Sequence, residues 1–253
     1  MVTPEIKRGT DLTSKELEEL DVLVHYLHHQ LPENHIQINH VEKTNPLFYL
    51  YKVDEKIVAC QAYTLSKVVT PFASRPLPII YINISYKYDW ANAHVKNFAK
   101  QSNLSFIREN IGRFWYFKKF ILAFHTVNPK LVERLSGTFE TYYPHYAYEV
   151  PSEVVAFANQ FCQNHLQEEG NTVSPQLVSC KEEVVNPVTE EKWKKMYQSA
   201  NPKRDKFFRD LGIYKEQPHQ KILTGRQIFF VGVYSLGGSL RKMWQSWTKV
   251  SKE

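Results

Sequence analysis

The sequence contains few cysteines, and their spacing argues against two classes of site. The three cysteines are odd in number and none stands in a Cys-x-x-Cys pair: Cys60, Cys162 and Cys180. An odd count without paired spacing disfavours both a disulfide framework and a structural zinc site. We therefore expect a protein of a reducing compartment.

Long apolar runs are also absent. The N-terminal stretch MVTPEIKRGTDLTSKELEEL has no apolar core of the secretory kind. No stretch approaches the roughly 18 apolar residues that a spanning helix needs. The sequence therefore predicts a cytoplasmic protein.

Metal and nucleic-acid signatures are missing as well. His25 stands about one helical turn before His28 and His29, but neither HExxH nor a carboxylate at ligand spacing accompanies them. The chain carries a net charge of +6 but no recognised nucleic-acid motif. We expect no metal site and no nucleic acid, while the positive charge remains compatible with phosphates, anionic lipid or an acidic carrier protein.

The chain is rich in aromatic residues and has the composition of a folded protein. Its hydrophobic content of 43% and charged content of 23% are typical of a globular chain. Apolar residues recur at helical spacing over residues 12–31, and two strand-like stretches follow at residues 47–53 and 56–69. The proline-rich residues 70–78 are expected to form a loop.

A strand, a helix and a second strand are predicted between Ile79 and Pro129. The strand PIIYINISYKY is followed by a helical pattern from Trp90 to Ile111, and then by the strand WYFKKFILAFHTV, which ends in Asn128-Pro129. A short helix is expected after Pro129. We predict two parts, residues 1–150 and residues 151–253, the second being a helical and strand extension packed on the first.

The C-terminal segment mixes aromatic and basic residues. RQIFFVGVYSLGGSLRKMWQSWTK contains Phe229, Phe230, Trp244 and Trp247 among arginines and lysines. This mixture suits the surface of an anionic membrane, and it equally suits a last strand and helix that complete the core. Peripheral membrane contact through this segment is therefore one of two interpretations.

The order of elements resembles that of the GNAT superfamily of acyltransferases. The hairpin at VDEKIVACQAY, the strand IIYINIS and the strand ending FHTVNP carry the resemblance, over about residues 12–150. It implies an α/β (α+β) fold whose mixed, mostly antiparallel sheet is flanked by helices and splayed between residues 79–88 and 117–127. The pantetheine arm of an acyl thioester would lie in that gap.

The sequence departs from this superfamily at the phosphate-binding loop. Members usually carry a Gln/Arg-x-x-Gly-x-Gly/Ala loop after the central strand, whereas this chain has SYKYDWANAHV and no glycine between Tyr81 and Arg108. Three explanations stay open. The donor could be an acyl-carrier protein, lysines could grip the phosphate of CoA, or catalysis could have been lost.

The resemblance implies a set of candidate residues. For the pantetheine arm these are Asn128 and the backbone of Ile84, Ser85 and Tyr86, and for phosphate Lys87 and Lys96. Tyr143 or Tyr142 would be the acid, and His125 or Asp89 the base. Ordinary structural roles compete with these assignments: Asn128 as a helix cap, the tyrosines as packing residues and His125 as a hydrogen-bonded core residue.

The predicted function is acyl transfer from acyl-CoA or an acyl-carrier-protein thioester to a small-molecule or lipid acceptor through its amine or hydroxyl. The alternative is a catalytically silent module of the same fold that binds a lipid, peptide or protein partner. The lost glycine loop favours the alternative, and the order of elements favours the enzyme.

Overall fold

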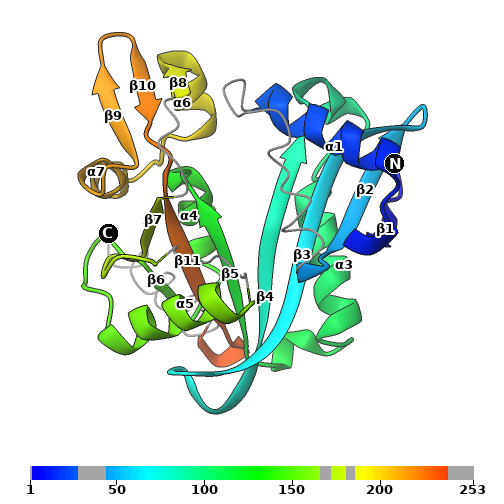
Figure 1. Ribbon diagram of the computed structural model, residues 1–253. Helices are drawn as coiled ribbons and strands as arrows, with labels where there is room; N and C mark the ends of the chain where they lie inside the picture. Colours follow the sequence, from blue (N-terminus) through cyan, green and yellow to red (C-terminus); the bar gives the residue numbers. More distant parts are fainter. Residues whose placement is uncertain (1, 28–43, 166–171, 181–185, 239–253) are drawn as a thin grey trace, which may run out of the picture.

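The computed structural model describes residues 2–27, 44–165, 172–180 and 186–238 (Figure 1). The first part of the chain forms β1 (Glu5–Arg8), η1 (Gly9–Asp11), α1 (Ser14–Leu27), β2 (Leu47–Val53), β3 (Lys56–Thr70), β4 (Ala73–Lys87), η2 (Asp89–Ala93), α3 (Phe98–Asn110), η3 (Trp115–Phe117), β5 (Phe120–Thr126), α4 (Pro129–Ser136) and β6 (Thr141–Tyr143). The remainder forms α5 (Ser152–His165), β7 (Val178–Cys180), β8 (Asn186–Thr189), α6 (Glu190–Met196), α7 (Pro202–Asp210), β9 (Tyr214–Gln217), β10 (Gln220–Leu223) and β11 (Arg226–Tyr234).

One large sheet organises the molecule. Its strand order is β1-β2-β3-β4-β5-β11-β6, and β7 pairs with residues 226–228 at the start of β11. Every neighbouring pair is antiparallel except β4 and β5, which are parallel. The predicted fold class, a mixed and mostly antiparallel sheet flanked by helices, is confirmed.

The last described strand lies inside the sheet. β11 pairs with β5 on one side and with β6 on the other, although residues 144–225 separate it from β6 in sequence. Those residues supply α5, β7 and a small lobe, here called the insert lobe, in which α6 and α7 accompany the sheet β8-β10-β9. The division at residue 150 stays a prediction, and the two stretches share this sheet.

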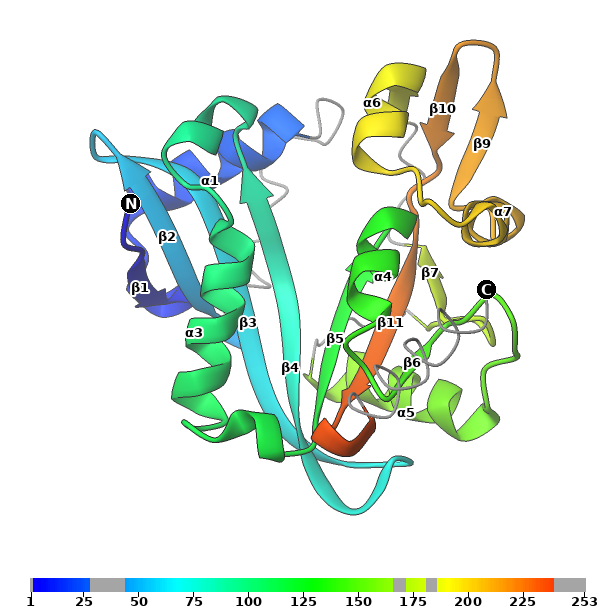
Figure 2. The same ribbon diagram turned by 180° about the vertical axis from the view of Figure 1, so that it is seen from behind.

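β4 and β5 pair only briefly before they diverge. The parallel register covers four residue pairs, from Ile79 with Ile121 to Ile82 with Phe124. At this point β4 carries a bulge, because Tyr63 of β3 faces Ile82 while the preceding Ala62 faces Ile84, so that Asn83 is the extra residue. Beyond it the two strands separate (Figures 1 and 2).

Helices cover both faces of the sheet. α1 and α5 lie on one face, where α1 packs on β2 and β3 and α5 packs on β4, β5 and β11. α3 and α4 lie on the other face, which Figure 2 shows from the front. Consecutive residues of β5 and β11 are apolar and buried and point alternately to the two faces, as expected for strands covered on both sides.

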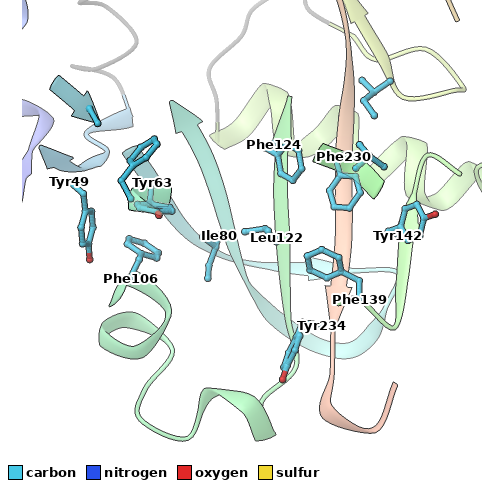
Figure 3. Packing of buried hydrophobic residues seen from close by; sticks show 14 of the residues in the cluster. Tyr49, Tyr63, Ile80, Phe106, Leu122, Phe124, Phe139, Tyr142, Phe230 and Tyr234 are labelled. Carbon is cyan, nitrogen blue, oxygen red and sulfur yellow. The ribbon is translucent and has the colours of Figure 1, made fainter. Parts of the chain in front are cut away.

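The core of the α3 and α4 face is aromatic (Figure 3). Phe230 of β11 stacks on Phe124 of β5 with ring centroids 4.7 Å apart, and on Tyr142 of β6 at 5.8 Å. Gly232 of β11 allows Phe139 to approach, since a Cβ at this position would lie 2.7 Å from the Phe139 ring. The tail residues Phe229, Phe230 and Val231 are therefore core residues, which contradicts the membrane interpretation for this part of the segment. Its remainder, including Trp244 and Trp247, lies outside the described residues.

Two local predictions were wrong. Residues 73–78 were expected to be a loop because of their prolines, but they begin β4. Pro76 and Pro78 precede the stretch that pairs with β5, so within the described residues β4 has a partner strand on one side only there, and edge positions tolerate proline. The helix predicted from Trp90 begins only at Phe98, because Asn97 adopts a left-handed backbone with φ of 59°.

A buried carboxylate anchors α1 to the sheet. Glu16 accepts hydrogen bonds from Lys7 Nζ at 2.7 Å and Lys52 Nζ at 2.8 Å. With Thr13 it also forms a reciprocal capping box at the start of α1. Burial by itself would raise the pKa of Glu16, but the bonds from Lys52, Lys7 and Thr13 outweigh it and lower the pKa to about 2.

This depressed pKa predicts a loss of stability in acid. A carboxyl whose pKa is lower in the folded state stabilises the fold above its unfolded pKa, and that contribution disappears as the pH falls toward the folded value. We expect Glu16→Gln to reduce the unfolding free energy by about 2 kcal/mol at pH 7 and by little near pH 2. Urea denaturation across this range measures it. The exposed Glu18→Gln is the control, and a difference between wild type and Glu16→Gln that stayed constant with pH would contradict the assignment.

Candidate functional site

A tyrosine and a histidine join β4 to β5 at the point where the strands part. The Tyr81 hydroxyl and His125 Nδ1 are 2.7 Å apart, and both side chains lie on the α5 face. Tyr81 is buried, whereas His125 is half-buried and its ring lies 5.1 Å from that of Phe229. The sequence predicted His125 as a candidate base, and in the structure its neighbour is Tyr81.

The bulge residue provides a second polar group at this point. Asn83 Nδ2 donates to Thr64 Oγ1 of β3 at 2.9 Å. Its Oδ1 is buried and has no hydrogen-bond partner within the part of the chain that the structure describes. A buried acceptor without a partner carries a free-energy cost, so Asn83 has capacity for one more donor.

The upper part of β4 contains the residues predicted to hold a pantetheine arm. Residues 84–87 pair with β3, and Asn83 is the unpaired bulge residue before them. None of these residues pairs with a described strand on the side of β5. Ser85 is exposed within this central strand, while Ile84 and Tyr86 pack toward α1. Burial raises the pKa of Tyr86 to about 12, so its hydroxyl is protonated at neutral pH.

The N-terminus of α3 lies next to this stretch. Its N-cap residue Asn97 makes no side-chain cap hydrogen bond. Lys87 Nζ contacts Asn92 Oδ1 and lies 5.5 Å from the centre of the Phe98 ring, in the first turn of α3. Lys96 is exposed. The two predicted phosphate-binding lysines thus flank a helix N-terminus whose first-turn amides have no side-chain cap.

Asn128 has a structural role in the described chain. Its Oδ1 accepts from Leu131 N at 3.1 Å and caps α4, and its Nδ2 donates to the carbonyl oxygen of Met196 at 3.1 Å. Both ends of the side chain are therefore engaged, and they connect β5 to the insert lobe. Its role toward a pantetheine arm stays a prediction.

The cap predicts a measurable effect of replacing Asn128. We expect Asn128→Ala to lower the unfolding free energy by about 1–2 kcal/mol, because α4 loses its cap and the insert lobe loses one tether. Asn128→Ser keeps an N-cap acceptor and loses only the bond to Met196, so it should cost less. Equal losses for the two variants in urea denaturation would show that the cap contributes nothing.

The two predicted acid tyrosines point to opposite faces of β6. Tyr142 is buried on the α4 face, where its hydroxyl accepts from Arg204 Nη2 at 3.3 Å. Tyr143 lies on the α5 face next to Phe72, with ring centroids 6.3 Å apart. β11 separates β6 from β5, so Tyr143 lies about 10 Å from the strand that carries His125. Neither tyrosine is adjacent to His125.

Asp89 is also distant from His125. β4 continues for six residues beyond Tyr81, or about 20 Å, before Asp89 opens η2 in an exposed position. Of the four predicted catalytic residues, only His125 lies at the divergence of β4 and β5. Tyr81 and Asn83 were missed, although polar residues alternate along IIYINIS; the bulge at Asn83 moves Ser85 to the opposite face from Tyr81.

Other candidate sites lie away from this point. Two surface hollows bounded by described residues have volumes of about 200 Å³ beside Tyr63 and Asn110 and about 650 Å³ on the insert lobe beside Trp193 and Asp205. Within the described ranges no group of three His, Cys, Asp or Glu side chains is placed to hold a metal ion. The described helices are all too short or too polar to cross a bilayer.

Comparisons with known proteins give structural matches only. No family model matches the chain, and no curated protein matches its sequence. A conserved protein of Enterococcus faecalis, described as a probable N-acyltransferase, is 16% identical with a TM-score of 0.39, and the match covers 54% of this chain and 33% of that one. This chain therefore spans about a third of that protein.

Two further structures match more of their own length. An acyl-CoA N-acyltransferase from Pseudomonas aeruginosa is 13% identical with a TM-score of 0.39, over 61% of this chain and 94% of that chain. An acetyltransferase from Vibrio fischeri is 14% identical with a TM-score of 0.33, over 47% and 94% respectively.

Proposed function

We propose that this chain is an acyltransferase that moves an acyl group from an acyl thioester to an amine or hydroxyl acceptor. The proposal rests on the divergence of the parallel strands β4 and β5 at the Asn83 bulge, with the hydrogen bond between Tyr81 and His125 at the point of divergence. Unpaired backbone groups in the middle of a sheet need partners, and a ligand rich in amides can supply them.

The upper part of β4 suits the pantetheine arm of the donor. An arm lying along residues 83–87 could pair with the backbone of Ile84, Ser85 and Tyr86 as an added strand pairs with a sheet edge. Ser85 is small and exposed, so its side chain leaves that edge open. The free Oδ1 of Asn83 could accept from an amide of the arm at its reactive end.

The anionic end of a CoA donor would meet α3. A helix N-terminus attracts negative charge, and here Lys87 and Lys96 add to that attraction. The connection has no glycine to let a pyrophosphate approach the backbone closely. An acyl-carrier protein, which presents the same arm without a nucleotide, is therefore the second donor to be tested.

His125 is assigned as the general base. The acceptor nitrogen or oxygen attacks the thioester carbonyl, the carbon–sulfur bond breaks, and the departing thiolate takes up a proton. We assign to His125 the transfer of the acceptor's proton to the thiolate, because an imidazole can act as both base and acid. Since Tyr81 holds Nδ1, this transfer uses Nε2, which is buried and has to become accessible when donor and acceptor bind. Tyr81 is assigned as a positioning residue whose hydroxyl fixes the imidazole at Nδ1.

Thiol release tests the function. The purified protein is incubated with a panel of acyl-CoAs and acyl-carrier-protein thioesters, with and without amine or hydroxyl acceptors. We expect release of free thiol that depends on the acceptor. Absence of both binding and turnover for every donor would reject the proposal.

The second candidate is a silent module that binds a lipid, peptide or protein partner at the same divergence. The exposed Asp89 after β4 favours it, since a carboxylate at that position repels a phosphate. Its expected result is binding of a ligand at residues 83–87 without any turnover.

A further inference from the structure

An aromatic loop and a hairpin form one surface at the end of the molecule opposite the site. The loop of residues 113–119 leads into β5, and the hairpin of residues 65–75 leads into β4. Both lie at the bottom of Figures 1 and 2. Lys119 Nζ donates to the carbonyl oxygen of Phe72 at 2.9 Å and ties them together. We call these two segments the aromatic end.

The loop is built to present aromatic rings to solvent. Trp115 turns inward and packs against Tyr234 at 5.4 Å between ring centroids. Lys118 Nζ bonds the carbonyl oxygen of Ile111, and the Tyr234 hydroxyl bonds that of Tyr116 at 3.4 Å. These contacts fix the backbone while Phe114 and Phe117 stay 59% and 67% exposed.

The hairpin adds apolar and basic side chains to the same end. Val69, near the turn, is 73% exposed, and Leu65 is also exposed. The exposed cations of the aromatic end are Lys67, Arg75, Arg113 and Lys118. Residues 65–79 and 110–122 contain no Asp or Glu. The surface is thus apolar and positively charged, without acidic residues of its own.

We propose that the aromatic end docks on the surface of an anionic lipid bilayer. Phe, Tyr and Trp side chains insert at the headgroup level, and flanking lysines and arginines pair with anionic headgroups. Aromatic residues and arginine are also enriched in protein–protein interfaces, while lysine is depleted there, so a second copy of the chain is the other occupant that the experiments below test. Lys119 pairs with the nearby Glu140 at 3.8 Å, but none of the four exposed cations forms an ion pair with a described carboxylate. The rigidly held aromatic rings and these cations together favour a membrane as the partner.

Docking in this way would leave the proposed acyl-transfer site away from the bilayer. The aromatic end lies at the amino ends of the parallel strands β4 and β5, and these strands diverge toward their carboxyl ends. The two functions are therefore separable, and membrane binding can be tested without any acyl donor.

Vesicle co-sedimentation tests the proposal on the full chain. Vesicles of phosphatidylglycerol and phosphatidylcholine in equal parts should pellet the protein, and pure phosphatidylcholine vesicles should do so at least about tenfold less well. Raising sodium chloride from about 0.1 M to about 0.5 M should weaken the binding, since salt screens exposed charges.

Two variants separate the apolar and electrostatic contributions. Phe114→Ser with Phe117→Ser, and Arg113→Glu with Lys67→Glu, should each reduce the vesicle partition coefficient at least about tenfold. Trp90→Ser is the matched control, because Trp90 is 56% exposed but follows the carboxyl end of β4. It should bind vesicles like the wild type, and unchanged circular dichroism verifies that each variant is folded.

Three results would overturn the proposal. Failure of wild type to bind the anionic vesicles would reject it directly. Undiminished binding by both folded double variants would place the membrane contact elsewhere. If the wild type were a dimer by light scattering, and the double variants lost the dimer but kept vesicle binding, the aromatic end would be a contact between two copies of the chain.

Discussion

Replacing His125 with alanine is expected to lower kcat/KM for acceptor-dependent thiol release by about 10² to 10⁴-fold, the usual contribution of a positioned acid–base group. The imidazole is the one predicted catalytic group that lies at the divergence of β4 and β5. Activity should be measured with the donor that gives the fastest release. The structure should survive the change, because His125 is only half-buried.

Two further variants make this result specific. Tyr81→Phe keeps the ring that packs on Phe229 and Phe161 and removes the hydroxyl that bonds Nδ1. We expect a smaller loss and a shift in the pH at which kcat/KM is half-maximal, which a purely structural role would not produce. The exposed His94→Ala is the control and should retain full activity. A folded His125→Ala protein with wild-type activity would remove His125 from the mechanism.

Replacing Phe230 with alanine is expected to lower the unfolding free energy by about 3–5 kcal/mol, the range found for large aromatic residues in cores. Phe230 is fully buried in β11 between Phe124 and Tyr142, so its loss leaves a cavity that joins β5, β11 and β6. Urea denaturation at constant m-value gives the change directly.

The same substitution at an exposed phenylalanine provides the control. Phe117→Ala should change the unfolding free energy by less than about 0.5 kcal/mol, as surface substitutions usually do. If Phe230→Ala cost less than about 1 kcal/mol, β11 would not belong to the core on which residues 1–150 depend. A single cooperative transition is expected, because residues from both predicted parts share this cluster.

Hydrophobic periodicity predicted the elements that fold on local signals. The α1 helix, the hairpin of β2 and β3, and the strands β4 and β5 follow from apolar spacing in their own residues. β6 was missed because three residues are too few to show a period, and the place of β11 beside it depends on pairing across residues 144–225. The prolines of β4 were misleading because their tolerance depends on an edge that only the assembled sheet creates.

The site was predicted in part for the same reason. His125 ends an apolar strand, so the sequence alone made it conspicuous. Tyr81 lies next to it only because of the register between β4 and β5, which the sequence does not reveal. Asn83 lies on the same face as Tyr81, and the sequence does not reveal that it is the extra residue of a bulge opposite Ala62 and Tyr63. Tyr142 and Tyr143 are adjacent in sequence but alternate between the faces of a strand, which separates both from His125.

Hydrogen exchange on residues 83–87 tests the central claim most directly. If the pantetheine arm adds to β4 as a strand, saturating amounts of an acyl thioester that the protein cleaves should slow exchange in peptides covering these residues. Peptides covering residues 65–75, at the opposite end, should be unchanged. Turnover of the donor with no protection at residues 83–87, or with protection confined to the insert lobe, would contradict the proposed position of the donor.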